Sequence, residues 1–418
     1  MHLSSKTNII ILLYISLLLG FYFGEDSLGG ALNDYQSHNH ISDKFNINFF
    51  DTLLNYDKLG HRHSPIFYII KSLLIEDDTI RRLIFLHFYI LIPIFFYKSL
   101  KIIFKNSSKT NLKLIASTLF LFPTVRSYSI WPDPHLLGTI FFIISVYYYL
   151  KFKNSKENNF KYSIFNTFFL AIAAYCSPNF GITVLFYLFE YFKKYSLGKK
   201  IIIILTSNLI LSLPFFYYLF YLDINFIFNE NGWDIGNNLF TINNLANKFV
   251  IVNSLFCFYL IPFFFTNFYV ENIKFLKNKN LFVLGALFFL FILLCLKFDF
   301  EAAYKLTNSG GGFFYNLSKL IIQNNLILFL ASLLGFLFII SSFYYNYSNI
   351  ILFITIIFSN PQLTLWQANY SPFIFMIIFL LLKLKYKNNI ISNNSIFSLF
   401  IYFSAYLLSN IFLKMYYI

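Results

Sequence analysis

Long apolar runs recur along this chain, and they constrain its fold more than any other feature. A helix that crosses a bilayer needs about 20 apolar residues. Only 12% of the 418 residues are charged and 58% are hydrophobic, whereas about a quarter of the residues in soluble domains are charged. We therefore predict an all-α, polytopic membrane bundle of about 13 transmembrane helices that forms a single domain over residues 1–418. The predicted spans are 8–23, 80–104, 112–130, 136–151, 162–176, 180–192, 201–221, 249–269, 281–297, 326–345, 349–360, 367–383 and 395–413.

Lysines gather in every second connection between these runs. With Lys6 placed in the cytoplasm, 20 of the 32 basic residues but only three of the 18 acids fall on the cytoplasmic side, which is the positive-inside pattern. The same scatter argues against a nucleic-acid partner despite the net charge of +14, because these lysines do not form one patch with stacking aromatics. The cysteines lie in or beside apolar runs and indicate neither a disulfide framework nor a thiolate metal site; they are Cys176, Cys257 and Cys295.

The segment 24–79 follows the first apolar run, and we expect it to be a large first outer loop with interfacial helices. It holds an unusual number of acids and histidines for so apolar a chain, among them Glu25, Asp26, Asp34, Asp43, Asp51, Asp57, His38, His40, His61 and His63. Such a cluster is costly near a bilayer and marks a candidate active site. Its stretch 64–75 is too short to span and carries Lys71, so we predict an interfacial helix there.

Two groups in this loop are typical of catalytic or binding chemistry. Asp34 follows Gly29 and Gly30, and a carboxylate there is a candidate general base or cation ligand; the alternative is a solvated loop acid. His61, Arg62 and His63 precede Pro65, a residue that often opens a helix. Arginine and a helix N-terminus both suit a phosphate, although these histidines could equally be surface residues of an interfacial loop.

A third group stands before the fourth apolar run. Asp133 and His135 are two residues apart at a helix mouth, so both could face one cation; the alternative is an aspartate cap before a proline at the first helical position. Arg126 and Trp131 nearby could contact a lipid phosphate or be ordinary interface anchors. The chain has no P-loop, Rossmann glycine pattern, HExxH motif or nucleophile elbow.

The layout of residues 8–190 resembles the GT-C superfamily of lipid-dependent glycosyltransferases. It looks most like the branch of protein O-mannosyltransferases and lipid A aminoarabinose transferases, in which an early acid in the first outer loop precedes a His-Pro-Pro-Leu-Tyr-Tyr-like segment. Here His63-Ser-Pro-Ile-Phe-Tyr68 stands in that place, Arg81 opens the second spanning run, and Asp133-Pro134 opens the fourth. Asp34 is single where the mannosyltransferases have an Asp-Glu pair.

The resemblance implies a cell-envelope enzyme of the bacterial inner membrane whose active site faces the periplasm. It would move a sugar from a polyprenyl-phosphate donor to a lipid, glycan or protein acceptor by an inverting displacement. Asp34 and His63 would be catalytic, and Arg62, His61 and Arg126 would bind the donor phosphate. Asp133, His135 and Asp34 are candidate ligands of a divalent cation, which would be the cofactor.

Two other classes stay open from the sequence. One is a transporter of polysaccharide or lipid-linked sugar, which would place ionisable residues at mid-membrane, whereas here they collect at one face. The other is an O-antigen polymerase or ligase, in which the large loop usually lies late in the chain and not first. In both cases, the position of the polar residues favours the transferase over the other class.

Overall fold

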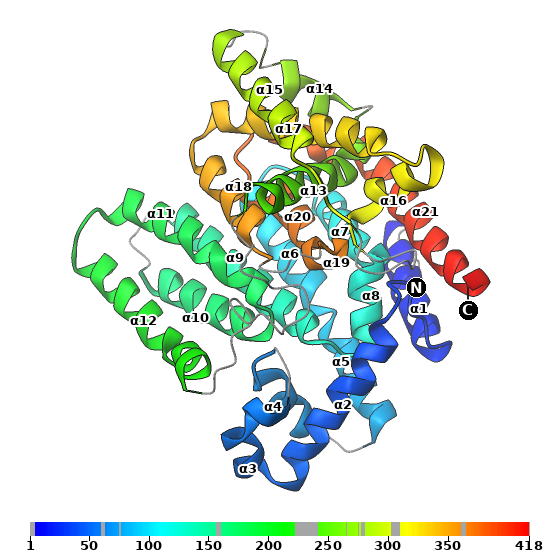
Figure 1. Ribbon diagram of the computed structural model, residues 1–418, viewed down its shortest axis with the longest axis vertical. Coiled ribbons are helices and arrows are strands. Elements are labelled where there is room, and N and C mark those ends of the chain that lie inside the picture. The colour runs from blue at the N-terminus through cyan, green and yellow to red at the C-terminus, as the bar shows by residue number, and fades with distance from the viewer. Residues whose placement is uncertain are drawn as a thin grey trace. The chain divides into compact units, whose positions relative to one another are not determined.

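The computed structural model describes residues 5–59, 63–74, 77–155, 160–221, 241–264, 266–274, 276, 281–301, 310–360 and 365–417, and all its regular elements there are helical (Figure 1). Contacts divide the chain into two compact units. Unit 1 comprises residues 1–225 and 400–418, and unit 2 comprises residues 226–399. The single-domain organisation stays a prediction, and each unit is described by itself.

Six described helices are long and apolar enough to cross a membrane, which suggests a multi-pass membrane protein. They are Asp78–Ile103, Pro134–Asn154, Lys199–Phe220, Ile242–Phe263, Leu326–Tyr345 and Asn393–Leu413. Shorter apolar helices occupy Asn8–Tyr22, Phe160–Cys176, Leu281–Leu296, Ser348–Phe358 and Gln367–Leu381. The prediction of about 13 spanning helices is therefore wrong: five of the predicted spans are short helices, and the runs 112–130 and 180–192 fall in neither group.

The run 112–130 is interrupted because its sequence contains a proline. It forms α7 (Lys109–Ser117), a 3₁₀ turn (Thr118–Leu121) and α8 (Pro123–Ile130). Phe122 is extended, as the residue before a proline prefers to be. α7 packs on α6 (Leu91–Ile103) and α8 on α5 (Asp78–Phe88), so the segment returns antiparallel to the α5–α6 pair.

The run 180–192 is shortened for a similar reason. Pro178 opens a 3₁₀ turn that extends to Thr183 and takes up the first four residues of the run. The helix that follows, α11 (Val184–Tyr195), has only 12 residues. Apolar content alone does not reveal either interruption, since the residues on both sides of each break are hydrophobic.

Helix α9 (Pro134–Asn154) is the central helix of unit 1. Most of its side chains are buried, and it packs on α6 and on α10 (Phe160–Cys176). Asp133 caps its first turn, while Lys151 and Lys153 lie in its last turn. In contrast, α12 (Lys199–Phe220) buries only Ile201 and Ile204. α1 (Ser5–Tyr22) packs on α7 and α8.

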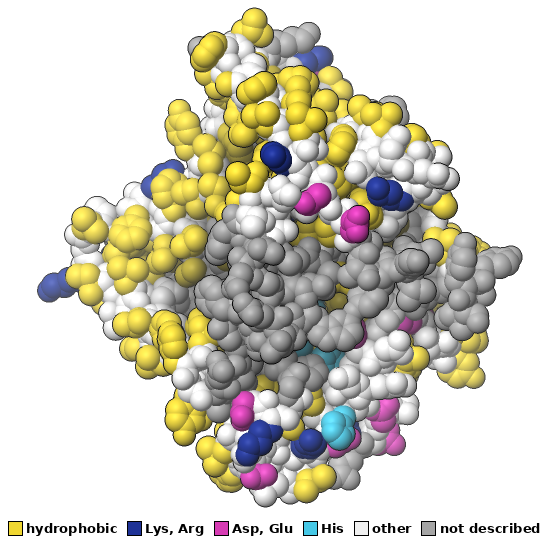
Figure 2. Space-filling view, in the orientation of Figure 1, with side chains coloured by type: hydrophobic (Ala, Val, Ile, Leu, Met, Phe, Trp, Pro, Cys, Tyr) yellow, Lys and Arg dark blue, Asp and Glu magenta, His cyan; other side chains and the backbone are white. Residues whose placement is uncertain are grey.

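The polar segment 24–79 is largely helical. It forms α2 (Ala31–Ile47), α3 (Phe49–Leu54), a 3₁₀ turn (Tyr56–Leu59) and α4 (Ile66–Ser72), which confirms a helix within residues 64–75. α2 packs on α3 and α4. Figure 2 shows charged and histidine side chains gathered over this group, while hydrophobic side chains dominate the visible face of α11 and α12.

Unit 2 is built on α13 (Ile242–Leu260) and α17 (Leu326–Tyr345), which pack along each other. A Cβ on Gly335 of α17 would collide with the backbone carbonyl of Asn253 in α13, so glycine permits the close approach. The other helices are α14 (Asn267–Lys274), α15 (Leu281–Leu296), α16 (Gly312–Ile321), α18 (Ser348–Phe358), α19 (Gln367–Tyr370) and α20 (Phe373–Met376). α21 (Asn393–Tyr417) belongs to both units.

Candidate functional site

Asp26 fixes the beginning of α2, and α2 presents the candidate residues. The Asp26 carboxylate accepts hydrogen bonds from the amides of Gly29 (3.0 Å), Gly30 (2.9 Å) and Leu32 (3.4 Å). Gly30 has φ 104°, a conformation that glycine adopts readily. Asp34 then lies in the first helical turn, where the helix dipole favours a negative charge, and not in the loop that we expected. Its side chain is exposed.

His38 follows Asp34 by one helical turn, so both residues lie on the same face of α2. The His38 side chain is buried, with Nε2 3.2 Å from Oδ2 of Asp133 and Nδ1 3.0 Å from the hydroxyl of Tyr68. The ring of His63 meets the His38 ring edge-on, with 5.8 Å between centroids. We call His38, His63, Tyr68 and Asp133 the histidine–aspartate cluster; it joins α2, α4, the segment before α4 and the start of α9.

Asp133 has two functions in this cluster. Its Oδ1 accepts the His135 amide at 2.7 Å, so the capping role is confirmed, and its Oδ2 faces His38. Burial alone would raise the pKa of Asp133, but hydrogen bonding and charge from His38, together with His63 and the His135 amide, lower that pKa below its usual value. An ionised carboxylate only accepts hydrogen bonds, so Nε2 of His38 carries a proton.

The hydrogen bonds of His38 give it a positioning role. With Nε2 as the donor to Asp133, Nδ1 lies 3.0 Å from the hydroxyl of Tyr68, within hydrogen-bonding distance. Burial, followed by the electrostatic effects of Tyr56, Asp133 and Asp34, raises the pKa of Tyr68 well above its usual value, so this hydroxyl keeps its proton. Both nitrogens of His38 are therefore engaged, and the chain Asp133–His38–Tyr68 holds the α2 face that carries Asp34 against α4 and α9.

The His135 side chain has partners other than this chain of hydrogen bonds, although its amide donates to Asp133. Its Nδ1 is 3.0 Å from the hydroxyl of Ser177, and its ring stacks on Phe180 with 5.4 Å between centroids. Among the described residues, no group of three His, Cys, Asp or Glu side chains is placed to hold a metal ion. A divalent cation at Asp34, Asp133 and His135 stays a prediction.

Arg126 is almost completely buried, and it binds Glu25. Its Nε donates to Glu25 Oε1 at 2.8 Å and its Nη2 to Glu25 Oε2 at 2.5 Å. The remaining N–H groups donate to Ser16 Oγ (3.1 Å), Ser16 O (3.0 Å) and Phe120 O (3.2 Å). All five donors of a guanidinium are thus used within the protein. A phosphate would have to displace one of these partners, which weakens the predicted role of Arg126 in donor binding.

Lys71 on α4 is a buried amine close to the cluster. Its side chain is 0% exposed, its Nζ lies 4.0 Å from the centroid of the Tyr35 ring, and the described residues offer Nζ no hydrogen-bond acceptor. Burial, and after it the charge of Arg81, lowers the pKa of Lys71 to about 7, while Asp78, Asp43 and Asp133 oppose the shift. The Tyr35 hydroxyl donates to Asp78.

The structure brings together part of the predicted site. His63 and Asp133 lie in one cluster, Asp34 is one turn from it on α2, and His135 and Arg126 have other partners. His61 and Arg62 lie outside the described residues. The sequence interpretation gave no role to His38 or Ser177. The four-residue spacing from Asp34 to His38 would place both on one helix face, but this is known only when residues 31–47 are known to be helical.

Comparison with known proteins gives no relative for this chain: no family model, curated protein or solved structure matches it. The likeness to GT-C enzymes therefore depends on the motifs described above.

Proposed function

We propose that this protein is a glycosyltransferase that moves a sugar from a polyprenyl-phosphate carrier to a hydroxyl acceptor at the outer face of a membrane. The observation that supports it best is the cluster at the start of α9. There His63 and Asp133 lie together, and a hydrogen-bonded chain fixes the helix face that carries the exposed Asp34. A carboxylate can take the proton of an acceptor hydroxyl, and an imidazole can stabilise the charge of a departing phosphate.

The charges at the two ends of α9 support the choice of side. Lys151 and Lys153 occupy the last turn of this helix and Asp133 its beginning. Because lysine-rich ends stay in the cytoplasm, the cluster would face outward. In a bacterium this is the periplasmic side of the inner membrane, where lipid-linked sugars are used for envelope assembly.

In the proposed reaction, the acceptor oxygen attacks the anomeric carbon of the donor sugar. The bond from that carbon to the phosphate oxygen breaks, its electron pair stays on the phosphate, and the configuration inverts. Asp34 takes the proton of the acceptor hydroxyl. His63, with His61 and Arg62 beside it in the sequence, would hold the phosphate, whose negative charge grows in the transition state. No step requires the candidate cation.

A transporter of lipid-linked sugar is the second candidate, and one observation favours it. Lys248 lies within the candidate span Ile242–Phe263 and is 2% exposed. Its Nζ donates to the carbonyl of Asn360 at 2.8 Å. A buried ionisable residue inside a membrane helix is typical of transport pathways. This candidate predicts movement of the lipid-linked sugar across the membrane without bond cleavage.

The test is transfer from a radiolabelled polyprenyl-phosphate sugar to endogenous acceptors in membranes. Asp34→Asn removes the charge and keeps the shape. If Asp34 is the base, this variant should lower turnover by about two to four orders of magnitude at unchanged expression. Asp57→Asn is the matched control, because Asp57 is an exposed acid of the same segment. Near-normal transfer by Asp34→Asn would refute the assignment, and translocation without transfer would identify a transporter.

A further inference from the structure

A cavity in unit 2 opens between three helices and lies outside the candidate site. Its volume is about 540 Å³, within the range of roughly 300–1,000 Å³ usual for ligand pockets. The walls come from α14, α15 and α17, and nearly all the lining is apolar; it includes Ile273, Leu284, Phe288, Phe336, Leu337 and Ile340. The one aromatic hydroxyl, on Tyr269, donates to the Leu334 carbonyl at 3.0 Å. The cavity therefore suits a hydrocarbon chain.

The surroundings of the cavity indicate that it opens to lipid. α15 consists of 16 residues, and only Phe291 is buried. Most of its other large side chains are exposed, with Leu281 and Phe282 each 83% and Leu296 76% exposed. An apolar surface of this extent is stable in hydrocarbon and not in water.

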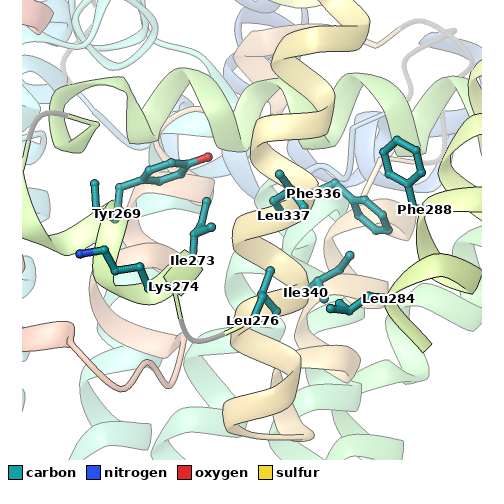
Figure 3. Close-up of a pocket in the computed structure, with 10 residues that line it drawn as sticks. Tyr269, Ile273, Lys274, Leu276, Leu284, Phe288, Phe336, Leu337 and Ile340 are labelled. Atoms are coloured by element: carbon teal, nitrogen blue, oxygen red, sulfur yellow. The ribbon is translucent and has the colours of Figure 1, made fainter. Parts of the chain in front are cut away.

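A lysine side chain, Lys274, lies at one edge of the cavity. Figure 3 shows Lys274 at the end of α14, with its ammonium directed away from the cluster of Phe288, Phe336 and Leu284. The Lys274 side chain is 56% exposed, and among the described residues it forms an ion pair with Glu271, at 3.3 Å on the preceding turn. The sequence continues with two further lysines in residues 277–279. Such lysine-rich connections mark the cytoplasmic surface, where anionic lipids concentrate.

We propose that this cavity binds one acyl chain of an anionic phospholipid from the cytoplasmic leaflet, with the headgroup phosphate beside Lys274. The apolar walls supply affinity for the chain, and the exposed ammonium supplies preference for a negative headgroup. The inference uses none of the residues of the proposed active site, so it stands whether or not the protein transfers a sugar.

The experiment uses the full chain in nanodiscs that contain a photoactivatable phosphatidylglycerol or phosphatidylcholine, with the cross-linked peptides located by mass spectrometry. We expect phosphatidylglycerol to label α14, α15 and α17 well above the exposed face of α12. Leu337→Trp should reduce this labelling several-fold because the larger ring fills the cavity. Leu209→Trp is the matched control, since Leu209 on α12 is 59% exposed and lies outside the cavity.

The headgroup is tested separately with Lys274→Gln. One lysine near a membrane surface contributes about 1 kcal/mol to binding of an anionic lipid, so the preference for phosphatidylglycerol over phosphatidylcholine should fall by about fivefold. Equal labelling of α12 and the cavity helices would overturn the site, and an unchanged preference in Lys274→Gln would overturn the headgroup assignment. If Leu337→Trp does not give a monodisperse protein, Phe288→Trp applies the same test at a more exposed wall position.

Discussion

At the scale of residues, polar side chains deep in this protein fall into two kinds. Arg126 uses all five of its donors within the protein, two of them on Glu25, which leaves little capacity for a ligand. Lys71 instead has no acceptor for its ammonium among the described residues and is held by the Tyr35 ring. A buried charge without a hydrogen-bond partner is costly, so Lys71 should be the residue whose charge most weakens the fold.

This cost should depend on pH in a defined window. The folded pKa of Lys71 is about 7 and its ordinary value is 10.5. Between about pH 7 and pH 10.5, Lys71 is protonated in the unfolded chain but not in the folded one. The free energy of unfolding therefore rises with pH across this range. Below about pH 7 both states are protonated and the full penalty, up to about 5 kcal/mol, is present.

Lys71→Met should therefore stabilise the protein most at pH 7 and below, and the advantage should shrink toward pH 10.5. Thermal unfolding of the purified variant and parent between pH 6.5 and 10 measures this difference. Lys58→Met, at an exposed lysine of the same segment, is the control. A difference between Lys71→Met and the parent that does not change with pH would show that Lys71 is not a buried, titrating amine.

The sequence alone indicates some residues of the candidate site and not others. Asp34, His63 and Asp133 were predictable because they stand in short motifs of unlike polar residues within an apolar chain. The partner of Arg126 was not, because Glu25 lies 101 residues earlier and nothing in the sequence links the two. His38 was overlooked because its role comes from contacts with Tyr68 and Asp133 in other segments.

At the scale of elements, apolar runs located the helices but not their ends or interruptions. α13 was expected over 249–269 and lies at 242–260. Its first turns are polar, and these side chains are satisfied inside the protein: Asn243 and Asn247 donate to Asp299 at 2.6 and 2.8 Å, and Lys248 to Asn360. Hydropathy cannot anticipate such partners. The helix ends where Pro262 opens a 3₁₀ turn.

The contact of α13 with α17 gives the second stability prediction. Gly335→Ala would place a Cβ against backbone atoms of Asn253 and Cys257, which cannot move without shifting α13. Overpacking of this kind costs about 1–3 kcal/mol, so the melting temperature should fall. Gly285→Ala in α15 is the matched control because a Cβ there meets nothing within 4 Å, and it should be neutral or slightly stabilising. Equal melting temperatures for both variants would contradict the close approach of α13 and α17.

At the scale of the whole molecule, the clearest prediction concerns which side of the membrane each connection faces. The all-α class followed from composition, because long apolar runs favour helices, which satisfy their backbone hydrogen bonds internally. The number of spans did not follow, because prolines divide or shorten two of the runs and five others form apolar helices of 10–17 residues. The lysine pattern still assigns the 24–79 segment to the outside and residues 193–200 to the inside.

Single cysteines at Ser37 and Ser196, both exposed positions, test this assignment in intact cells once Cys176, Cys257 and Cys295 are all replaced by serine. An impermeant thiol reagent should label Ser37→Cys directly and Ser196→Cys only after the membrane is opened. Labelling of Ser196→Cys alone in intact cells would show that the topology is the reverse of the predicted one, and would contradict the proposed outward-facing site.

The ion pair between Glu25 and Arg126 also has a consequence for how the protein is made. Arg126 leaves the ribosome 101 residues after Glu25, a delay of roughly 5–20 s at ordinary rates of synthesis. During that interval α1 carries a carboxylate at its exit with no guanidinium to meet it, and Gly20 leaves space that only the completed pair fills. The bidentate contact of Glu25 therefore forms only after Arg126 has been synthesised, so the packing of α1 on α8 is completed after this point of the chain.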